Sequence, residues 1–261
     1  MEECTERLAQ LGEKARTLDL RLSFHPGQYV VLNSESEKVR AAAVRDLELQ
    51  SRVLDAFGLG GEAVVVLHVG SMAGGPEAGI DRFLESFDKL SERARTRLVI
   101  ENDDRCYALA DVLKISERTG LPVAWDVLHH HCHDPVGIPD REALELALAT
   151  WPAGVTPKTH FSTPKTAMAE RVRRKGRRVE RSLVLPQLRA HADLVDPIAF
   201  EQFLRTTASG RVRRDARGEG EGRRVATAAR AAGPAWNLCR RWVGRRANEQ
   251  REHRHSVAPL T

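Results

Sequence analysis

The sequence has few cysteines and no arrangement that would pair them. The four that it contains, Cys4, Cys106, Cys132 and Cys239, are scattered and never spaced as Cys-X-X-Cys. Such scattering argues against a disulfide framework and against a structural zinc site. We therefore expect the chain to work in a reducing compartment.

Long apolar runs are also absent. No run reaches the length needed to cross a membrane, and the N-terminal stretch MEECTERLAQ lacks the apolar core of a secretion signal. We expect a soluble, cytoplasmic and monomeric protein without a membrane partner.

Size and charge set wider bounds. The chain has 261 residues and 41% hydrophobic content, enough for one α/β barrel domain or two small domains. A formal net charge of +5 and a pI near 9.3 permit a polyanionic partner without requiring one. The positive charge is regional, because arginine is concentrated in residues 171–181 and 211–254.

The spacing of apolar residues predicts alternating helices and strands. Continuous apolar runs such as Ala63–Leu67 are typical of buried parallel strands. The predicted helices cover residues 2–17, 37–57, 80–90, 111–118 and 142–151, and the predicted strands cover 21–24, 63–67, 98–100 and 122–125, with a short one ending at 160.

This alternation implies a parallel sheet wrapped by helices, which right-handed crossovers close into a barrel. The fold class we expect is α/β, an incomplete TIM barrel with about five or six of its eight strands, over residues 1–204. Residues 205–261 contain Arg, Ala and Gly in irregular order. We expect a basic tail there that is disordered or translated out of frame, which the other two reading frames of the coding DNA would test.

The predicted strands end in side chains that can bind a metal. Because the carboxyl ends of all strands in a parallel barrel lie on one face, these residues should converge. Imidazole and carboxylate ligands together suit Mn, Zn or Fe, whereas Mg or Ca prefers oxygen alone. The strand-end residues are His25, His68, Glu101, Asp126 with His129, and Lys158 with His160, and His191 and Asp193 could reach the same rim from a later loop.

Simpler interpretations exist for each residue taken alone. A single strand-end histidine is more often a structural group than a ligand, and Asp103 or Asp104 could cap the next helix. The three imidazoles of residues 129–131 cannot all face one site, and the basic cluster 171–181 is by default a solvated loop. Five consecutive strand ends nevertheless favour a metal site.

Six motifs resemble, in order and spacing, those of the UV-damage DNA endonucleases. The resemblance covers roughly residues 6–204, and six ordered motifs make chance agreement improbable. The motifs are HPGQY from His25 to Tyr29, LHVG from Leu67 to Gly70, ENDD from Glu101 to Asp104, the segment from Asp126 to His131, KTHFS from Lys158 to Ser162, and HAD from His191 to Asp193.

This resemblance implies a xylose-isomerase-like TIM barrel that incises damaged double-stranded DNA immediately 5′ to UV photoproducts, without ATP. It also implies up to three divalent ions, with Mn favoured and Mg or Zn possible. Glu101, His129 and Lys158 would be catalytic, and Lys158 corresponds to a lysine that can be carboxylated. The implied metal ligands are His25, His68, Glu101, Asp126, His129, His160 and His191.

The resemblance further implies contacts with DNA. Gln28 and Tyr29 match a pair that probes the lesion by wedging into the duplex, where a poorly stacked site costs less to kink. Basic residues that could contact the DNA backbone are Arg173, Arg174, Lys175, Arg177 and Arg178.

Two other classes of protein compete with this interpretation. A sugar isomerase or epimerase on the same barrel also gathers His, Asp and Glu around paired ions, and fold alone does not separate the two. Gln28 and Tyr29 after the HPG motif and the basic cluster favour a nucleic-acid substrate. The other class is an inactive truncated remnant. The family's first strands and a late glutamate ligand are not recognisable here, so we expect weak folding and little or no incision by this chain alone.

Overall fold

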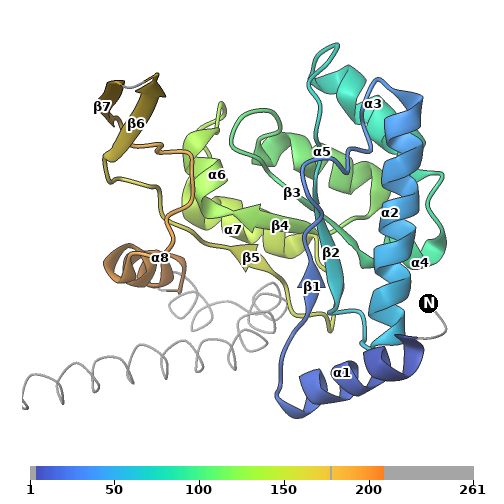
Figure 1. The fold of residues 1–261 in the computed structure, drawn as a ribbon. Helices are drawn as coiled ribbons and strands as arrows, with labels where there is room; N and C mark the ends of the chain where they lie inside the picture. Colours follow the sequence, from blue (N-terminus) through green and yellow to red (C-terminus); the bar gives the residue numbers. More distant parts are fainter. Residues whose placement is uncertain (1–3, 177, 209–261) are drawn as a thin grey trace, which may run out of the picture. The chain divides into compact units, whose positions relative to one another are not determined.

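Five parallel strands form the central sheet of the protein. The computed structural model describes residues 4–176 and 178–208, and contacts group the chain into a compact unit that ends at Thr207. The strands lie in the order β1-β2-β3-β4-β5, and all neighbours are parallel (Figure 1). This confirms the expected incomplete barrel. The strands are β1 (Ser23–Phe24), β2 (Val64–His68), β3 (Leu98–Glu101), β4 (Val123–Asp126) and β5 (Thr159–His160).

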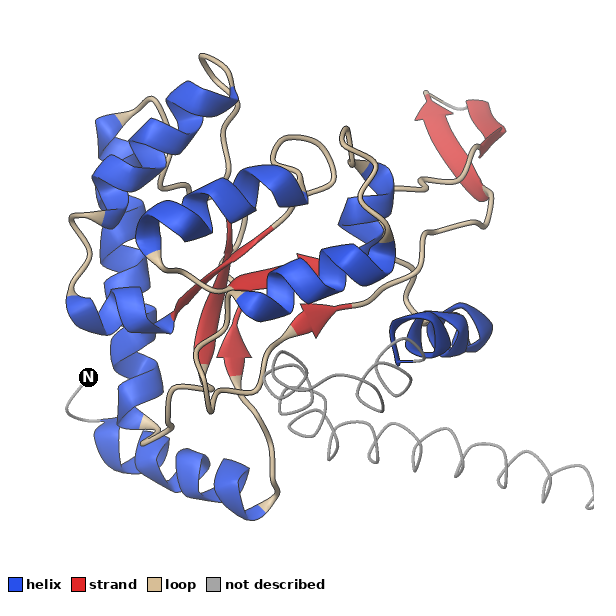
Figure 2. Cartoon of the chain, turned by 180° about the vertical axis from the view of Figure 1, so that it is seen from behind, coloured by secondary structure: helices blue, strands red, loops and turns tan. Residues whose placement is uncertain are grey.

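Helices connect the strands and cover one face of the sheet. Seen from behind, helices lie across the strands (Figure 2), and α2, α5 and α7 contact β2, β3 and β4. The two short helices α4 and α6 were not predicted, because six residues are too few to show a helical period. The helices are α1 (Thr5–Thr17), α2 (Glu37–Ala56), α3 (Pro76–Phe87), α4 (Glu92–Arg97), α5 (Leu109–Thr119), α6 (Val127–Cys132), α7 (Asp140–Ala149) and α8 (Pro197–Ala208). None of the helices within the described residues is long and apolar enough to span a membrane.

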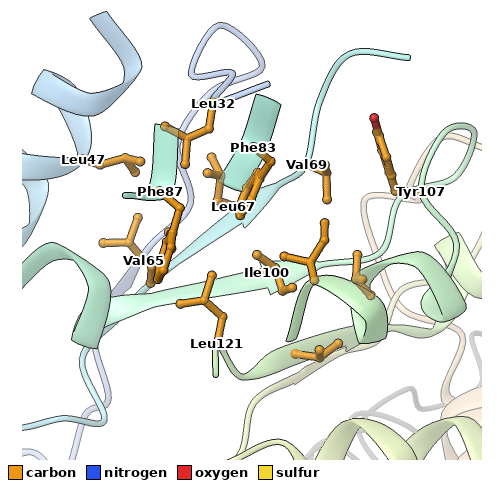
Figure 3. Packing of buried hydrophobic residues seen from close by; sticks show 14 of the residues in the cluster. Leu32, Leu47, Val65, Leu67, Val69, Phe83, Phe87, Ile100, Tyr107 and Leu121 are labelled. Carbon is orange, nitrogen blue, oxygen red and sulfur yellow. The ribbon is translucent and has the colours of Figure 1, made fainter. Parts of the chain in front are cut away.

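The main core lies between the sheet and the helices. Val65, Leu67 and Ile100 point toward the helices and pack in one cluster with Phe83 and Phe87 of α3 (Figure 3). Aliphatic side chains of this kind contribute roughly 1.5–3 kcal/mol each when fully buried. The cluster therefore fixes which face of each strand is turned toward the helices.

The opposite face of the sheet holds a smaller apolar layer and, beyond it, polar residues. Val66, Val99 and Ala124 belong to a second buried cluster, separate from the main core. Because side chains alternate between the two faces of a strand, the next position on this face is His68 in β2 and Glu101 in β3. The alternation of side chains along each strand thus places polar groups at one end of this second face.

Side chains join the two edge strands across this second face. Lys158 Nζ, just before β5, donates to Ser23 Oγ of β1 at 2.6 Å. Arg21 Nη1 donates to the carbonyl of Pro157 at 3.3 Å. Since β1 and β5 lie at opposite edges of the sheet, these contacts require strong curvature, and the second face is the concave one.

The basic cluster 171–181 is not the loop that we expected. Strands β6 (Ala169–Lys175) and β7 (Arg178–Val184) form an antiparallel hairpin, with Gly176 in its turn at φ +64°. Their apolar residues, such as Val172 and Leu183, are exposed and interrupted by arginine, so the strand period is hard to recognise.

Helix α8 follows the hairpin and packs on the sheet. Its residues Phe200 and Phe203 both have ring centroids 5.0 Å from that of Phe161, which follows β5. The helix ends at Ala208, and the rest of the predicted basic tail, residues 209–261, lies outside the described residues.

Candidate metal centre

One buried carboxylate, that of Glu101 at the end of β3, is surrounded by imidazoles. Its side chain is 1% exposed. Oε2 lies 2.8 Å from His25 Nε2, and Oε1 lies 2.7 Å from His160 Nδ1. His68 Nε2 and His129 Nδ1 lie at 3.7 and 3.8 Å. Residues from β2, β5 and α6, and the residue that follows β1, therefore converge on a single group.

The electrostatics of this cluster favour an ionised carboxylate. Burial opposes ionisation, but hydrogen bonds from His160 and His25 outweigh it and hold the pKa of Glu101 well below its usual range. The same hydrogen bond to Glu101 raises the pKa of His25, whereas burial lowers the pKa of His68. An anionic carboxylate next to a mostly neutral imidazole is a suitable pair of ligands for a divalent cation.

A second part of the site is built from the start of α6. Asp126, 2% exposed, accepts the backbone N–H of His129 at 2.8 Å and thereby caps the helix. His129 Nδ1 donates to the carbonyl of Asn102 at 3.0 Å, which leaves Nε2 as the free ring nitrogen. That nitrogen lies 3.1 Å from His191 Nε2.

These residues fit a set of divalent cations. The distance of 3.1 Å between His129 Nε2 and His191 Nε2 suits a shared cation, because two ligand atoms at about 2.1 Å from one cation lie about 3 Å apart. His68 Nδ1 is buried and has no hydrogen-bond partner in the described part of the chain. Ligand atoms lie within 4.8 Å of one another in three groups, which are His25–Glu101–His160, His68–Glu101–His129 and Asp126–His129–His191.

Asn102 is a residue of this site that sequence reasoning missed. Its side chain is fully buried and bonds twice to the backbone of Asp126, as donor to the carbonyl at 3.0 Å and as acceptor from the N–H at 2.9 Å. The amide therefore continues the ladder between β3 and β4 beyond the last backbone pair. The sequence feature that could have indicated its role is its position directly after Glu101, at the end of a predicted strand.

Several polar neighbours point elsewhere. His130 Nε2 lies 2.8 Å from the carbonyl of Ile138, and His131 Nε2 lies 2.8 Å from Asp140, so of the three consecutive imidazoles His129 alone belongs to a ligand group. Asp193 does not join the rim either. Its side chain is 94% exposed and pairs with Lys165 at 3.4 Å.

Asp103 and Asp104 also have structural roles. The Asp103 carboxylate accepts the backbone N–H groups of Arg105, Cys106 and Tyr107, so it stabilises the turn that precedes α5 rather than capping the helix itself. Asp104 pairs with Arg105 at 3.2 Å.

The residues expected to contact DNA lie on the surface. Gln28 and Tyr29 are exposed, Tyr29 to 83%, and they are the two central residues of the turn closed by the hydrogen bond from Val30 N–H to the carbonyl of Gly27. Arg173, Arg174 and Arg178 are exposed on the β6–β7 hairpin, and Lys175 is the last residue of β6. Arg177 lies outside the described residues.

A curved parallel sheet with ligand-type side chains at the carboxyl ends of its strands defines a barrel of the TIM type. The crystal structure of SacUVDE has the same fold, with a TM-score of 0.64 and 33% identity over 77% of this chain and 62% of that one. The family model of the UV-endonuclease UvdE matches residues 1–199, and the chain belongs to this family.

Curated relatives agree with this placement. The UV DNA damage endonuclease of Bacillus velezensis is 31% identical over 73% of this chain and 54% of its own length. That of Clostridium perfringens is 35% identical over 57% of this chain and 36% of its own length. The chain thus spans about half the length of the curated relatives, or less. The resemblance found in the sequence is confirmed.

Replacing Asn102 by alanine should weaken metal binding. The substitution removes both side-chain hydrogen bonds to the backbone of Asp126, so the Asp126 carboxylate and His129 lose part of the support that fixes their orientation. Loss of such a supporting contact typically costs 10–100-fold in affinity, and we expect roughly that for Mn²⁺ in a chelator-competition titration. Ser116→Ala, which removes a buried hydrogen bond from α5 to the carbonyl of Leu121, is the matched control. Equal affinity for Asn102→Ala and wild type would contradict the assignment.

The His131–Asp140 pair should make stability depend on pH. Its hydrogen bond raises the pKa of His131 above 6.5 and lowers that of Asp140. The stabilisation is complete below the unfolded-state pKa of His131 and is lost as the pH rises through the raised folded-state value. In urea unfolding with chelator present, His131→Gln should therefore cost more stability near pH ~6 than near pH ~9. A cost that is the same at both pH values would rule this out.

Proposed function

We propose that the described residues form the metal-holding and lesion-contacting part of a UV-damage endonuclease. The proposed reaction is metal-dependent hydrolysis of a phosphodiester immediately 5′ to UV photoproducts and other distorting lesions. The observation that supports it most directly is the ring of imidazoles around Glu101, with the exposed pair Gln28–Tyr29 only a few residues after His25.

The ligand groups overlap in a way that suits neighbouring cations. Glu101 belongs to two of the three groups, and His129 also belongs to two. A shared carboxylate can hold adjacent ions, so up to three divalent ions, with Mn favoured, is the occupancy that we propose. Such ions supply positive charge that offsets the charge of an in-line phosphoryl transition state, and they make water more acidic.

Lys158 stands on the same face as the ligands, two residues before His160. Burial, assisted by the positive charge of Arg21, lowers the pKa of the Lys158 amine. A lowered pKa increases the fraction of neutral amine, which is the form that adds carbon dioxide with loss of a proton to give a carbamate. Its environment therefore supports the role that the family resemblance implies, a modified lysine that adds a carboxylate to the site.

Contact with damaged DNA is assigned to two surface elements. The Tyr29 ring and the Gln28 amide are exposed in the turn that follows β1, where they could enter a poorly stacked step of the duplex. The β6–β7 hairpin would bind phosphates. Its strand register places Arg173 and Arg178 on one face, which gives that face two guanidinium groups for the backbone.

The ion count tests this function directly. We expect wild-type protein to bind more than one Mn²⁺, because the ligand groups are present, and to nick UV-irradiated duplex slowly at most, because the described part contains five strands of the barrel. Glu101→Gln should bind less than one ion and lose about 10²-fold or more of any incision rate. Glu117→Gln, an exposed change on α5, should match wild type. Wild-type protein with less than one ion and no incision would identify an inactive remnant instead.

The hairpin can be tested through the salt dependence of binding. Each phosphate contact contributes about 0.9 to the slope of log K against log salt concentration. Arg173→Ser with Arg178→Ser should therefore reduce the slope by about 1–2, equally for damaged and undamaged duplex. Arg45→Ser on the exposed side of α2 is the control. An unchanged slope in the double variant would exclude the hairpin from the interface.

A further inference from the structure

Three loops that each follow a candidate ligand are joined by one buried polar network. Asn33 lies in the loop after β1 and His25, Ser71 in the loop after β2 and His68, and Tyr107 in the loop after β3 and Glu101. Asn33 and Tyr107 are both fully buried. We call Asn33, Ser71 and Tyr107 the loop clamp.

Asn33 uses both ends of its side-chain amide in the loop clamp. Nδ2 donates to the carbonyl of Ser71 at 2.7 Å and to Tyr107 Oη at 2.9 Å, while Oδ1 accepts the Ser71 N–H at 2.6 Å. Tyr107 Oη in turn donates to the same Ser71 carbonyl at 2.7 Å. Burial raises the pKa of Tyr107 to about 12, so the hydroxyl keeps its proton at neutral pH.

The surroundings leave the loop clamp no space to shift. A Cβ on Gly79 of α3 would lie 1.9 Å from Tyr107 Oη, and one on Gly70 would lie 2.9 Å from Asn33 Oδ1. Arg82 of α3 also holds Asn33 in place, because its Nε donates to the carbonyl of Asn33 at 2.8 Å. Glycine is therefore required where α3 and the β2 loop approach the clamp.

The exposed pair Gln28–Tyr29 lies between two buried anchors. On one side Pro26 is buried, next to His25 in its contact with Glu101. On the other side Leu32 is 0% exposed and is followed directly by Asn33. The tip is short and exposed, but the chain on either side of it is fixed.

We propose that Asn33 and Tyr107 are positioning residues for lesion selectivity, because they hold the Gln28–Tyr29 tip in the conformation that enters damaged DNA. This inference rests on the proposed function of that tip. Rigid presentation lowers the entropy lost on binding. It also prevents the tip from adapting to an intact duplex, so a loosened clamp should reduce discrimination more than it reduces affinity for undamaged DNA.

The first arm of the test measures how firmly the loop that carries Gln28 and Tyr29 is held. Tyr107→Phe keeps the ring in the core and removes the hydroxyl, and Ser116→Ala removes a buried hydroxyl elsewhere as the matched control. Tyr107→Phe removes two hydrogen bonds, to Asn33 and to Ser71. We expect hydrogen–deuterium exchange in residues 26–34 to be at least about fivefold faster in this variant, since about fivefold is the effect of a single lost hydrogen bond, and unchanged in Ser116→Ala. Equal exchange in Tyr107→Phe and wild type would overturn the proposal.

The second arm measures selectivity, as the ratio of affinities for a duplex with one cyclobutane dimer and the same duplex undamaged. Tyr107→Phe should lower this ratio about fivefold to tenfold while affinity for the undamaged duplex stays within about twofold. In a Tyr29→Ala background the same change should have no further effect, because the clamp acts through the tip. Additive losses would indicate a general structural effect and overturn the proposal.

The two arms separate this inference from the proposed function. If wild-type protein does not distinguish the two duplexes, lesion recognition by this chain is refuted, and the proposal falls with it even if the exchange arm shows a loosened loop. If wild-type protein distinguishes them and Tyr107→Phe loosens the loop without changing the ratio, the clamp is structural and the proposed function stands.

Discussion

The described structure depends on keeping one ionised carboxylate out of water. An unpaired charge in a protein interior costs several kcal/mol, and Glu101 is 1% exposed. Its cost is offset only where His25 and His160 reach it from the two edge strands, and those strands meet only in a strongly curved sheet. The curvature of the sheet and the convergence of the ligands on its concave face therefore keep this buried charge compensated, whether protons or metal cations supply the balancing charge.

Much of this arrangement could be predicted from the sequence, because the pattern of apolar and polar residues shows where each strand lies and where it ends. An apolar run such as Ala63–Leu67 identifies a buried strand, and the first polar residue after it, His68, is placed at the strand's end. The same reasoning located Glu101 and Asp126. Parallel topology then brings these ends together, so the candidate site follows from local patterns and one rule of barrel geometry.

The parts that could not be predicted depend on partners distant in the sequence. Asn33 is one of several polar residues in its loop, and nothing nearby shows that its amide bonds to Tyr107, 74 residues away. Asn102 is similar, because its role appears only once β4 is placed beside β3. The β6–β7 hairpin was missed for a different reason, since an exposed two-stranded ribbon buries neither face and so has no apolar alternation to detect.

The bond between Lys158 and Ser23 has a consequence for the order in which the protein is built. It joins residues 135 positions apart, as does the neighbouring contact from Arg21 to Pro157 across 136. Contacts of such long range close late in folding, after the local helix–strand units have formed. During synthesis His25 emerges long before His160, so the cluster of side chains around Glu101 cannot be completed until most of the sheet has left the ribosome. A cation would then bind after the sheet has formed, and it would not nucleate folding.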